Sequence, residues 1–408
     1  VEISGQALNT EAIEAEKVYR KAAKTRKRHS FFGLTAIAFF EFCVIGILSS
    51  GLQEGDLQTR LEREKQFQNT GKIDFSAGTY TGDTDFGLLQ GTGEFDFETG
   101  TVYIGDWENN QPSGSGRLVI PSEGEYSGKF SASKKNGHGV FTWADGSVYD
   151  GEWKDDKLSG KGTYTGADGT CYEGIFTNNA FDTGACDFKN DTGSYHLEYV
   201  SGAIDHCRIS FSDETVYEGD CTENGITGTG TITFPNEDSY NGSFENGVRN
   251  GDGTYSWKSG DSYEGDWSDD QMSGSGKYLF NNGNLLEGEF SENSFVSGSY
   301  HVKNDFGEYL FTIVEKEPTQ VSMELSDGTK YEGQMDGDGL NGHALITYNN
   351  HDKYDGNVKQ GEKSGNGKYS WSNGAEYDGE WKDDKMNGKG TYKYSDSEEG
   401  YSIEGHFS

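Results

Sequence analysis

Basic residues are scarce in this chain of 408 residues. It has 34 Lys and Arg against 69 Asp and Glu, which gives a formal net charge of −35 at pH 7. A surface this acidic repels phosphate groups. The composition therefore argues against nucleic acid and against anionic lipid as ligands of the main part of the chain. It favours basic partners or weak association with divalent cations.

Motifs for catalysis and for cofactors are also lacking. The eight histidines are scattered, and the nearest group, His196, His206 and Cys207, does not have the spacing of a metal or nucleophile site. No Gly-x-Ser-x-Gly elbow is present. The segment 336–339 lacks the ligand spacing of an EF-hand. We therefore expect no enzyme activity, no catalytic residue, no cofactor and no metal. Three acid pairs are interpreted as solvated turns, namely Asp155-Asp156, Asp269-Asp270 and Asp383-Asp384.

What the sequence does contain is a repeat. The segment from Tyr149, YDGEWKDDKLSGKGTY, returns as YEGDWSDDQMSGSGKY from Tyr263 and as YDGEWKDDKMNGKGTY from Tyr377. Weaker copies place a tyrosine every 22 or 23 residues, with Leu286 once in its place, which gives fourteen anchors. The three strong copies lie 114 residues apart. The chain therefore has a second, longer period that spans five units. A fixed period of this kind indicates a repeat architecture.

Alternation within a unit predicts a β-hairpin. From Tyr149 to Trp153 the aromatics and the glycine alternate with acids, which is typical of a strand with one packed face. Residues 155–159 supply a turn, residues 161–165 the second strand, and residues 167–169 the next turn. The packed face is expected to hold the motif residues Tyr103, Trp107, Tyr149, Gly151, Trp153, Tyr263, Gly265, Trp267, Tyr377, Gly379 and Trp381. Stacked hairpins of this kind predict an all-β, elongated and twisted antiparallel meander about 130 Å long.

The motif resembles the MORN repeat (membrane occupation and recognition nexus). The resemblance rests on Tyr149-Asp-Gly-Glu-Trp153 and Gly160-Lys-Gly162-Thr-Tyr164 at a pitch of 23 residues, and it extends from Lys72 to the end of the chain. It implies a meander of about fourteen hairpins that serves as a scaffold or partner-binding surface, often in membrane-associated proteins. Binding of acidic phospholipids, which is attributed to some members, is not expected here because of the acidic charge.

One long hydrophobic run precedes the repeats. Residues 1–30 end in a basic segment, and Phe31 to Leu52 would form about 33 Å of helix, enough for the roughly 30 Å core of a bilayer. The pattern predicts one transmembrane helix over residues 31–52 and a short stalk over residues 53–70, before a repeat array over 71–408. Because the basic residues precede the helix, the N-terminus is expected in the cytoplasm and the repeats on the extracytoplasmic side.

Glu41 lies near the middle of the predicted helix. An ionised side chain at that depth costs about 3 kcal/mol on insertion scales. One interpretation is a polar contact with a second transmembrane helix, as part of a complex or an oligomer. The other is a protonated glutamate that an otherwise apolar helix tolerates.

Four cysteines cluster within the repeats. Cys171, Cys186, Cys207 and Cys221 fall around one irregular unit, whereas the positions 114 residues later hold apolar or aromatic residues. They are read either as buried core residues or as two disulfides with three alternative pairings. Cys207 and Cys221 fall on adjacent strands of one predicted hairpin. Cys207 is expected opposite Asp220, so that their pairing requires a bulge.

Two units abandon the Gly-x-aromatic part of the motif, near residues 190–212 and 304–328. We expect a bend, a bulge or an exposed edge there, because such units cannot stack their rings as the others do. Taken together, the features predict a membrane-anchored scaffold that binds protein partners through its acidic repeats and its helix. The alternative is a cell-surface protein that binds carbohydrate or a wall polymer through exposed aromatic rings.

Overall fold

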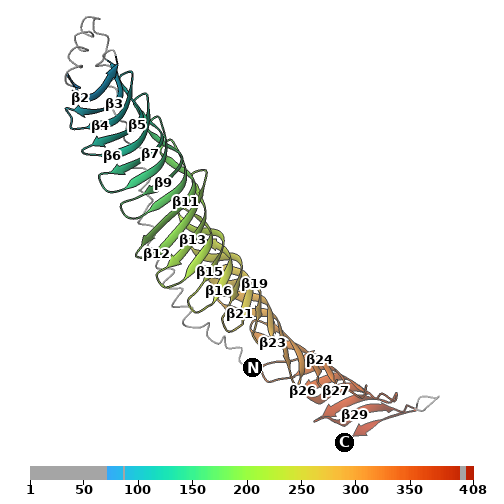
Figure 1. Ribbon diagram of the computed structural model, residues 1–408. Helices are drawn as coiled ribbons and strands as arrows, with labels where there is room; N and C mark the ends of the chain where they lie inside the picture. Colours follow the sequence, from blue (N-terminus) through green and yellow to red (C-terminus); the bar gives the residue numbers. More distant parts are fainter. Residues whose placement is uncertain (1–70, 86–87, 396–400) are drawn as a thin grey trace. The chain divides into compact units, whose positions relative to one another are not determined.

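The computed structural model describes residues 71–85, 88–395 and 401–408. The chain divides into two compact units, and their described parts lie within residues 71–228 and within residues 229–408. Each is an antiparallel meander in which a strand pairs with the strand that follows it in the chain (Figure 1). The predicted all-β meander is thus confirmed for the described residues.

The first unit contains short strands that are joined by tight turns. They are β1 (Lys72–Phe75), β2 (Gly78–Asp85), β3 (Leu88–Phe97), β4 (Val102–Glu108), β5 (Gln111–Ile120), β6 (Gly124–Ser131), β7 (Lys134–Trp143), β8 (Val148–Lys154), β9 (Lys157–Thr165), β10 (Cys171–Thr177), β11 (Ala180–Asn190), β12 (Gly193–Val200), β13 (Ala203–Phe211) and β14 (Val216–Thr222). Strand β15 (Gly225–Thr233) contains the division between the units.

The second unit continues the same pattern. Its strands are β16 (Ser239–Glu245), β17 (Val248–Ser256), β18 (Ser262–Ser268), β19 (Gln271–Leu279), β20 (Leu285–Ser291), β21 (Ser294–Asn304), β22 (Gly307–Val314), β23 (Glu317–Leu325), β24 (Lys330–Gln334), β25 (Gly342–Thr347), β26 (Lys353–Lys359), β27 (Glu362–Ser370), β28 (Glu376–Lys382), β29 (Lys385–Lys393) and β30 (Ser402–Phe407).

The helical part of the predicted fold class is wrong for the part of the chain that the structure describes. Residues 71–85, 88–395 and 401–408 form strands and turns, and no helix there is long and apolar enough to cross a membrane. The reason is that polar and apolar residues alternate along these segments, which favours strands. The predicted transmembrane helix over 31–52, with Glu41, and the predicted stalk over 53–70 lie outside the described residues. The localisation inferred from that helix stays a prediction.

The turn inside the Tyr149 hairpin is shorter than the sequence predicts. In the unit of Tyr149 only Asp155 and Asp156 form it, both with left-handed backbone (φ 48° and 67°), and β9 begins at Lys157. Aspartate and asparagine tolerate this conformation, which suits a two-residue hairpin turn. The extra residues of the predicted turn belong to an irregular part of β9, where the register shifts opposite Gly151 and Trp153.

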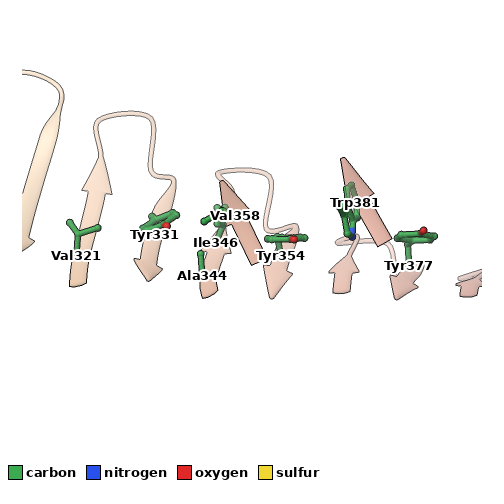
Figure 2. Close-up of a cluster of buried hydrophobic side chains, with 8 residues drawn as sticks. All are labelled: Val321, Tyr331, Ala344, Ile346, Tyr354, Val358, Tyr377 and Trp381. Atoms are coloured by element: carbon green, nitrogen blue, oxygen red, sulfur yellow. The ribbon is translucent and has the colours of Figure 1, made fainter. Parts of the chain in front are cut away.

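Aromatic rings on one face of each sheet form the core. Tyr149 is completely buried, and its ring meets those of Trp153 and Phe176 edge to face at centroid distances of 5.4 Å and 5.0 Å. Figure 2 shows the corresponding face of the second unit, where Tyr354 and Tyr377 lie alike on successive hairpins. Each ring therefore contacts its own hairpin and the next, which binds neighbouring hairpins together.

Candidate functional site

The motif tyrosine is locked to its own hairpin by polar and steric contacts. The Tyr149 hydroxyl donates to the carbonyl oxygen of Glu152 at 3.0 Å. Its ring crosses the backbone at Gly151 and Gly162, which face each other across β8 and β9. A Cβ added at Gly162 would lie 2.4 Å from the tyrosine hydroxyl. The glycines of the motif are therefore required by close approach of the ring.

The motif tryptophan links each hairpin to the preceding one. The Trp153 indole N–H donates to the carbonyl oxygen of Gly139 at 2.9 Å, and its ring lies edge to face between Tyr126 and Tyr149. Trp381 makes the same bond to Gly367 at 2.8 Å. All the tyrosines and tryptophans predicted for the packed face are buried, namely Tyr103, Trp107, Tyr149, Trp153, Tyr263, Trp267, Tyr377 and Trp381. The predicted glycines Gly265 and Gly379 face Gly276 and Gly390 beneath such rings.

The two-residue turns are also joined to one another. The second residue of a turn accepts a hydrogen bond through its side-chain oxygen. The donor is the backbone N–H of the residue 21 positions earlier in the chain, which lies on the preceding hairpin. The N–H of the turn residue donates to the carbonyl oxygen of that same earlier residue. We call the later residue the cap and the earlier one the capped residue. Six such pairs are Asn110 with Leu89, Asp156 with Lys135, Asn179 with Leu158, Asp270 with Arg249, Asn293 with Met272, and Asp384 with Lys363.

Charge is matched within these six pairs. Asparagine caps an apolar residue in three of them, and aspartate caps a lysine or an arginine in the other three. The three cations, Lys135, Arg249 and Lys363, are 114 residues apart. The sequence analysis did not identify them, although their recurrence at the longer period was the available signal. It also interpreted their aspartates as solvated turn residues, whereas Asp270 is buried and all three bind backbone N–H groups.

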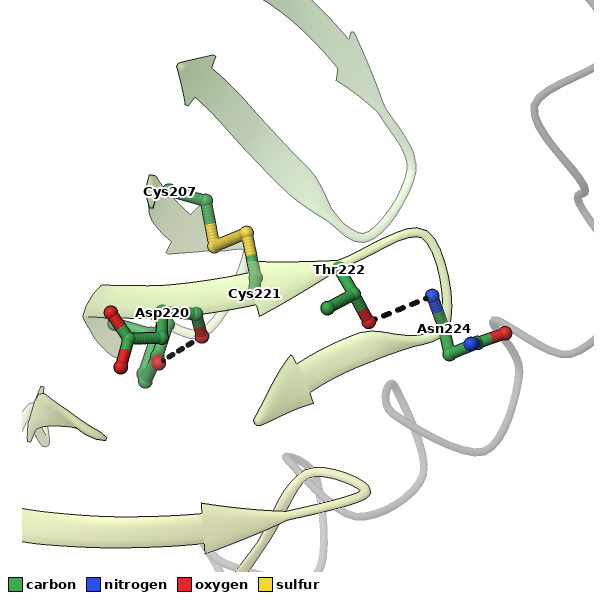
Figure 3. The surroundings of a disulfide bond; sticks show 6 residues. Cys207, Asp220, Cys221, Thr222 and Asn224 are labelled. Carbon is green, nitrogen blue, oxygen red and sulfur yellow. Dashed lines mark hydrogen bonds between the residues drawn. A yellow bond between two sulfur atoms is a disulfide. The ribbon is translucent and has the colours of Figure 1, made fainter. Parts of the chain in front are cut away.

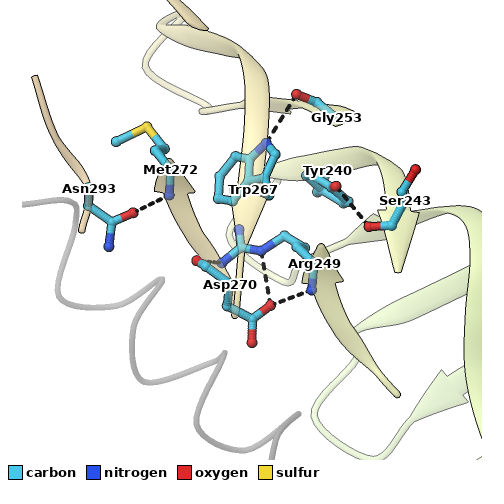
Figure 4. A network of polar contacts seen from close by, with 8 residues as sticks. All are labelled: Tyr240, Ser243, Arg249, Gly253, Trp267, Asp270, Met272 and Asn293. Atoms are coloured by element: carbon cyan, nitrogen blue, oxygen red, sulfur yellow. Dashed lines mark hydrogen bonds and ion pairs between the residues drawn. The ribbon is translucent and has the colours of Figure 1, made fainter. Parts of the chain in front are cut away.

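Arg249 shows how such a cation is held (Figure 4). Its guanidinium carbon lies 4.4 Å from the ring centroid of Trp267 and 5.5 Å from that of Tyr240. The ring centroid of Tyr255 is 5.2 Å away. Asp270 lies 3.2 Å from Nε through Oδ1, and the same oxygen accepts the Arg249 backbone N–H at 2.8 Å. The arginine thus combines cation–π contacts with a buried ion pair.

The two lysines of this type differ in their protonation equilibria. Lys135 is almost completely buried among Tyr126, Phe141 and Trp153, and burial lowers the pKa of its ammonium group to about 8 despite Asp156. Burial also disfavours the charge of Lys363, but its ion pair with Asp384 at 2.8 Å outweighs that effect and raises the pKa of Lys363. Both ammonium groups lie among aromatic rings of the core.

A disulfide joins Cys207 on β13 to Cys221 on β14 (Figure 3), with their Cα atoms 6.0 Å apart. The expected register is off by one residue, because Gly219 and not Asp220 lies opposite Cys207. Cys221 is therefore a diagonal neighbour on the same face, two positions further along. Residues Cys207 to Ser210 pair without a register shift, so the expected bulge is not needed. The small glycine leaves space for the bond.

The other two cysteines of the cluster are free thiols. Cys186 lies opposite Tyr172, whereas Cys171 lies opposite Asp187. Their side chains consequently project from opposite faces of the sheet. His196 binds the carboxylate of Asp187 through Nδ1 at 2.7 Å on the exposed face. No group of three metal-ligating side chains occurs among the described residues.

The two irregular units keep their hydrogen bonding. Strands β12 and β22, at their centres, each pair with a strand on both sides, so neither is an exposed edge. Register shifts occur at Glu198/Tyr199 and at Thr312/Ile313, but shifts also occur in regular hairpins. What distinguishes the second irregular unit is Leu310, which is large, apolar and exposed where the first irregular unit has His196, whereas Val314 and its counterpart Val200 are both exposed.

Comparison with a sequence model of the MORN repeat identifies seven matching segments. They are residues 103–124, 126–148, 149–171, 240–262, 263–285, 354–376 and 377–398. MORN repeats are thus detected in these seven segments. The other expected MORN units, including both irregular ones, lie outside the matches, although the structure folds them as hairpins of the same kind. No curated protein matches the chain.

Solved structures resemble the chain only weakly. The TCP domain of SAS-4 (dCPAP) of Drosophila melanogaster, in complex with a proline-rich motif of Ana2, is 12% identical and covers 50% of this chain and 90% of its own, with a TM-score of 0.19. The G-box domain of CPAP is 11% identical over 55% of this chain and 100% of its own, also with a TM-score of 0.19. A streptogramin B lyase is 11% identical over 62% of this chain and 89% of its own, with a TM-score of 0.12. Scores this low do not show a shared fold.

Proposed function

We propose that this chain is a scaffold that binds proteins through the exposed face of its repeat hairpins. The proposal rests on one observation: the residues that define the repeat make the contacts within and between the hairpins. The rings of Tyr149 and Trp153 are buried, and their polar atoms are bonded to the backbone. What varies from hairpin to hairpin, and is free to select a partner, is the exposed face.

The exposed face is rich in charged side chains. It carries exposed ion pairs such as Arg117 with Glu125, Arg208 with Glu218, and Lys277 with Glu287. Exposed pairs of this kind contribute little to stability. Because the chain carries a net charge of −35, the expected partners are basic proteins.

Burial of the rings argues against the alternative of carbohydrate binding. Sugar rings stack on exposed aromatic faces, but the four motif tryptophans Trp107, Trp153, Trp267 and Trp381 are at most 6% exposed. Trp143, Trp257 and Trp371 are only half-buried, and Phe306, Tyr394 and Tyr401 are exposed, so these are the rings that a glycan could use.

Crosslinking tests the proposal. The full-length chain is produced in its own cells with a tag, crosslinked through lysines, purified and analysed by mass spectrometry. We expect crosslinks from a protein partner to lysines of the exposed face, such as Lys161 and Lys277, reduced at high salt. The proposal would be overturned if no protein crosslink formed and a polysaccharide bound strongly on a glycan array. Carbohydrate binding would then be the better supported function.

A further inference from the structure

The exposed face of the second unit carries a row of leucines that the repeat motif does not explain. Strand pairing places Leu279 opposite Leu285, Leu285 opposite His301, and His301 opposite Leu310. The row continues through Ser322 and Glu332 to Leu345, each opposite the one before. Residues opposite each other in an antiparallel sheet share a face. We call Leu279, Leu285, Leu310 and Leu345 the leucine row.

The leucine row is exposed to solvent. Leu279, Leu310 and Leu345 are 44%, 46% and 41% exposed, and Leu285 is half-buried. Large apolar side chains that gather on an otherwise charged face mark an interaction site. Nothing in hairpin packing requires them, because the rings of the core lie on the other face.

The longer repeat supplies an internal comparison. The residues 114 positions before Leu279, Leu285 and Leu310 are Thr165, Cys171 and His196, which occupy the same register positions in the first unit. That earlier row is filled by polar contacts, a hydrogen bond between His196 and Asp187 and an ion pair between Arg208 and Glu218. At these register positions the leucines are therefore found in the second unit and not in the first, where Ile104 and Val200 are exposed at other positions of the face.

The charges around the leucine row indicate the kind of partner. On the same face, Lys277 is paired with Glu287, Lys303 with Glu308, and Lys330 with Glu324. Further acids stand in the row itself, Glu332 beside Leu345 and Asp355 beyond it. A second copy of this chain would bring acids against acids, since each copy has a net charge of −35. The neighbouring basic residues are already neutralised, so complementary charge has to come from a basic partner.

We infer that the leucine row binds an amphipathic helix of a partner protein, with an apolar stripe flanked by Lys and Arg. From β19 to β25 the row crosses six strand spacings, about 29 Å at roughly 4.8 Å each. A helix of about 19 residues has that length at 1.5 Å per residue. The helix would lie across the strands with its apolar stripe on Leu279, Leu310 and Leu345. This inference rests on the proposed scaffold function and specifies its partner.

A defined peptide tests the inference. The probe is a fluorescent 20-residue helical peptide of Leu and Lys in amphipathic order, and binding to the full-length chain is followed by fluorescence anisotropy at about 150 mM salt. A triple variant receives the side chains found 114 residues earlier, Leu279→Thr, Leu310→His and Leu345→Thr. We expect its affinity to fall at least tenfold. Glu332→Lys alone should weaken binding severalfold, and Val200→Thr, at an apolar residue exposed outside the row, should leave it unchanged.

Three results would overturn the inference. Equal binding of the peptide to the wild type and the triple variant would show attraction by charge alone. If a peptide of Leu and Glu in the same order bound the chain equally well, the positive charge of the partner would have no role. A wild-type dimer in light scattering that the triple variant abolishes would make a second copy the occupant. In each case partner crosslinks elsewhere on the array would still support the scaffold function, whereas loss of all protein crosslinks would remove that function itself.

Discussion

Arg249 and Asp270 bind each other through both main chain and side chains, although they belong to successive hairpins. Asp270 accepts the Arg249 N–H, returns its own N–H to the Arg249 carbonyl, and pairs with the guanidinium in the core. In the next hairpin of the array, Met272 and Asn293 make the cap bond without any charge. The cap therefore matches the charge of the residue it covers.

Replacing Asp270 by asparagine tests how much the charge matching between Asp270 and Arg249 contributes to stability. The variant keeps a cap oxygen and a residue that tolerates left-handed backbone, but it leaves a buried guanidinium without its carboxylate. We expect the free energy of unfolding to fall by about 3 kcal/mol. Urea unfolding followed by tryptophan fluorescence measures the change.

A second substitution should reverse the loss. Arg249→Met together with Asp270→Asn recreates the Met272 and Asn293 arrangement, and we expect most of the stability to return. Asp269→Asn, at the exposed first position of the turn, serves as the control and should change stability by less than about 0.5 kcal/mol. If the double variant were no more stable than Asp270→Asn alone, charge matching would not explain the cap.

Lys135 should make stability depend on pH in the alkaline range. Its pKa of about 8 in the folded chain lies below the ordinary value of 10.5, so between these values the unfolded chain binds more protons. The contribution of Lys135 to stability should therefore rise with pH in that window, by about 2 kcal/mol from pH 8 to 9.5, measured as the difference between the wild type and Lys135→Met. Urea unfolding at several pH values measures it. The comparison with the variant is needed because burial also raises the pKa of tyrosines such as Tyr80, to about 12, and ionisation of tyrosines in the unfolded chain lowers the stability of both proteins as the pH approaches 10.

Two variants separate the contribution of Lys135 to the pH dependence from that of the other titratable groups. Lys135→Met should lose the stabilising contribution of Lys135 between pH 8 and 9.5, so that its stability falls with pH relative to the wild type. Lys363→Met should leave the pH dependence as in the wild type, because the pKa of Lys363 is raised and its contribution changes only above that window. If stability still rose steeply with pH in Lys135→Met, a group other than Lys135 would be responsible for the pH dependence.

Gly162→Ala should test the close approach of the motif ring. The added Cβ would meet the Tyr149 hydroxyl at 2.4 Å, and we expect a loss of at least about 2 kcal/mol from overpacking, measured by thermal unfolding. Gly337→Ala is the matched control, because a Cβ there meets nothing within 4 Å. Similar losses in both variants would indicate a backbone effect and not a contact with the ring.

The disulfide should contribute measurably to stability. Cys207 and Cys221 are separated by 14 residues, and closing a loop of that size stabilises a fold by about 3 kcal/mol. Reduction should lower the free energy of unfolding by that amount, whereas Cys171→Ser should change it little. Mass spectrometry of the unreduced protein should find one disulfide, and a full set of free thiols would contradict the assignment.

Much of the hairpin architecture can be predicted from sequence because each strand carries its own signal. The alternation from Tyr149 to Trp153 identifies the packed face directly, and the structure buries both rings. The two-residue turn at Asp155 and Asp156 was harder to predict. Polar residues continue into β9, so composition does not show where the turn ends, and the boundary depends on left-handed backbone at two positions.

The polar interactions in the core could not be predicted from local patterns. Lys135 looks like an exposed strand residue, and Asp156 looks like a solvated turn residue. They meet only because hairpins stack with a constant offset, which places residues 21 apart in contact. The leucine row has the same origin, since Leu279 and Leu310 become neighbours on one face through strand register alone. Only the comparison of positions 114 residues apart carries such information in the sequence.

Charge-matched caps also constrain how a protein of this kind can lengthen or shorten. Deleting the 23 residues 149–171 would bring Asn179 to the turn that covers Lys135, and the lysine would lose its carboxylate. Deleting the 114 residues 149–262 would bring Asp270 there instead, with the charge preserved. The segment that can be duplicated or removed without damage is therefore the block of five hairpins, and the single hairpin is not interchangeable.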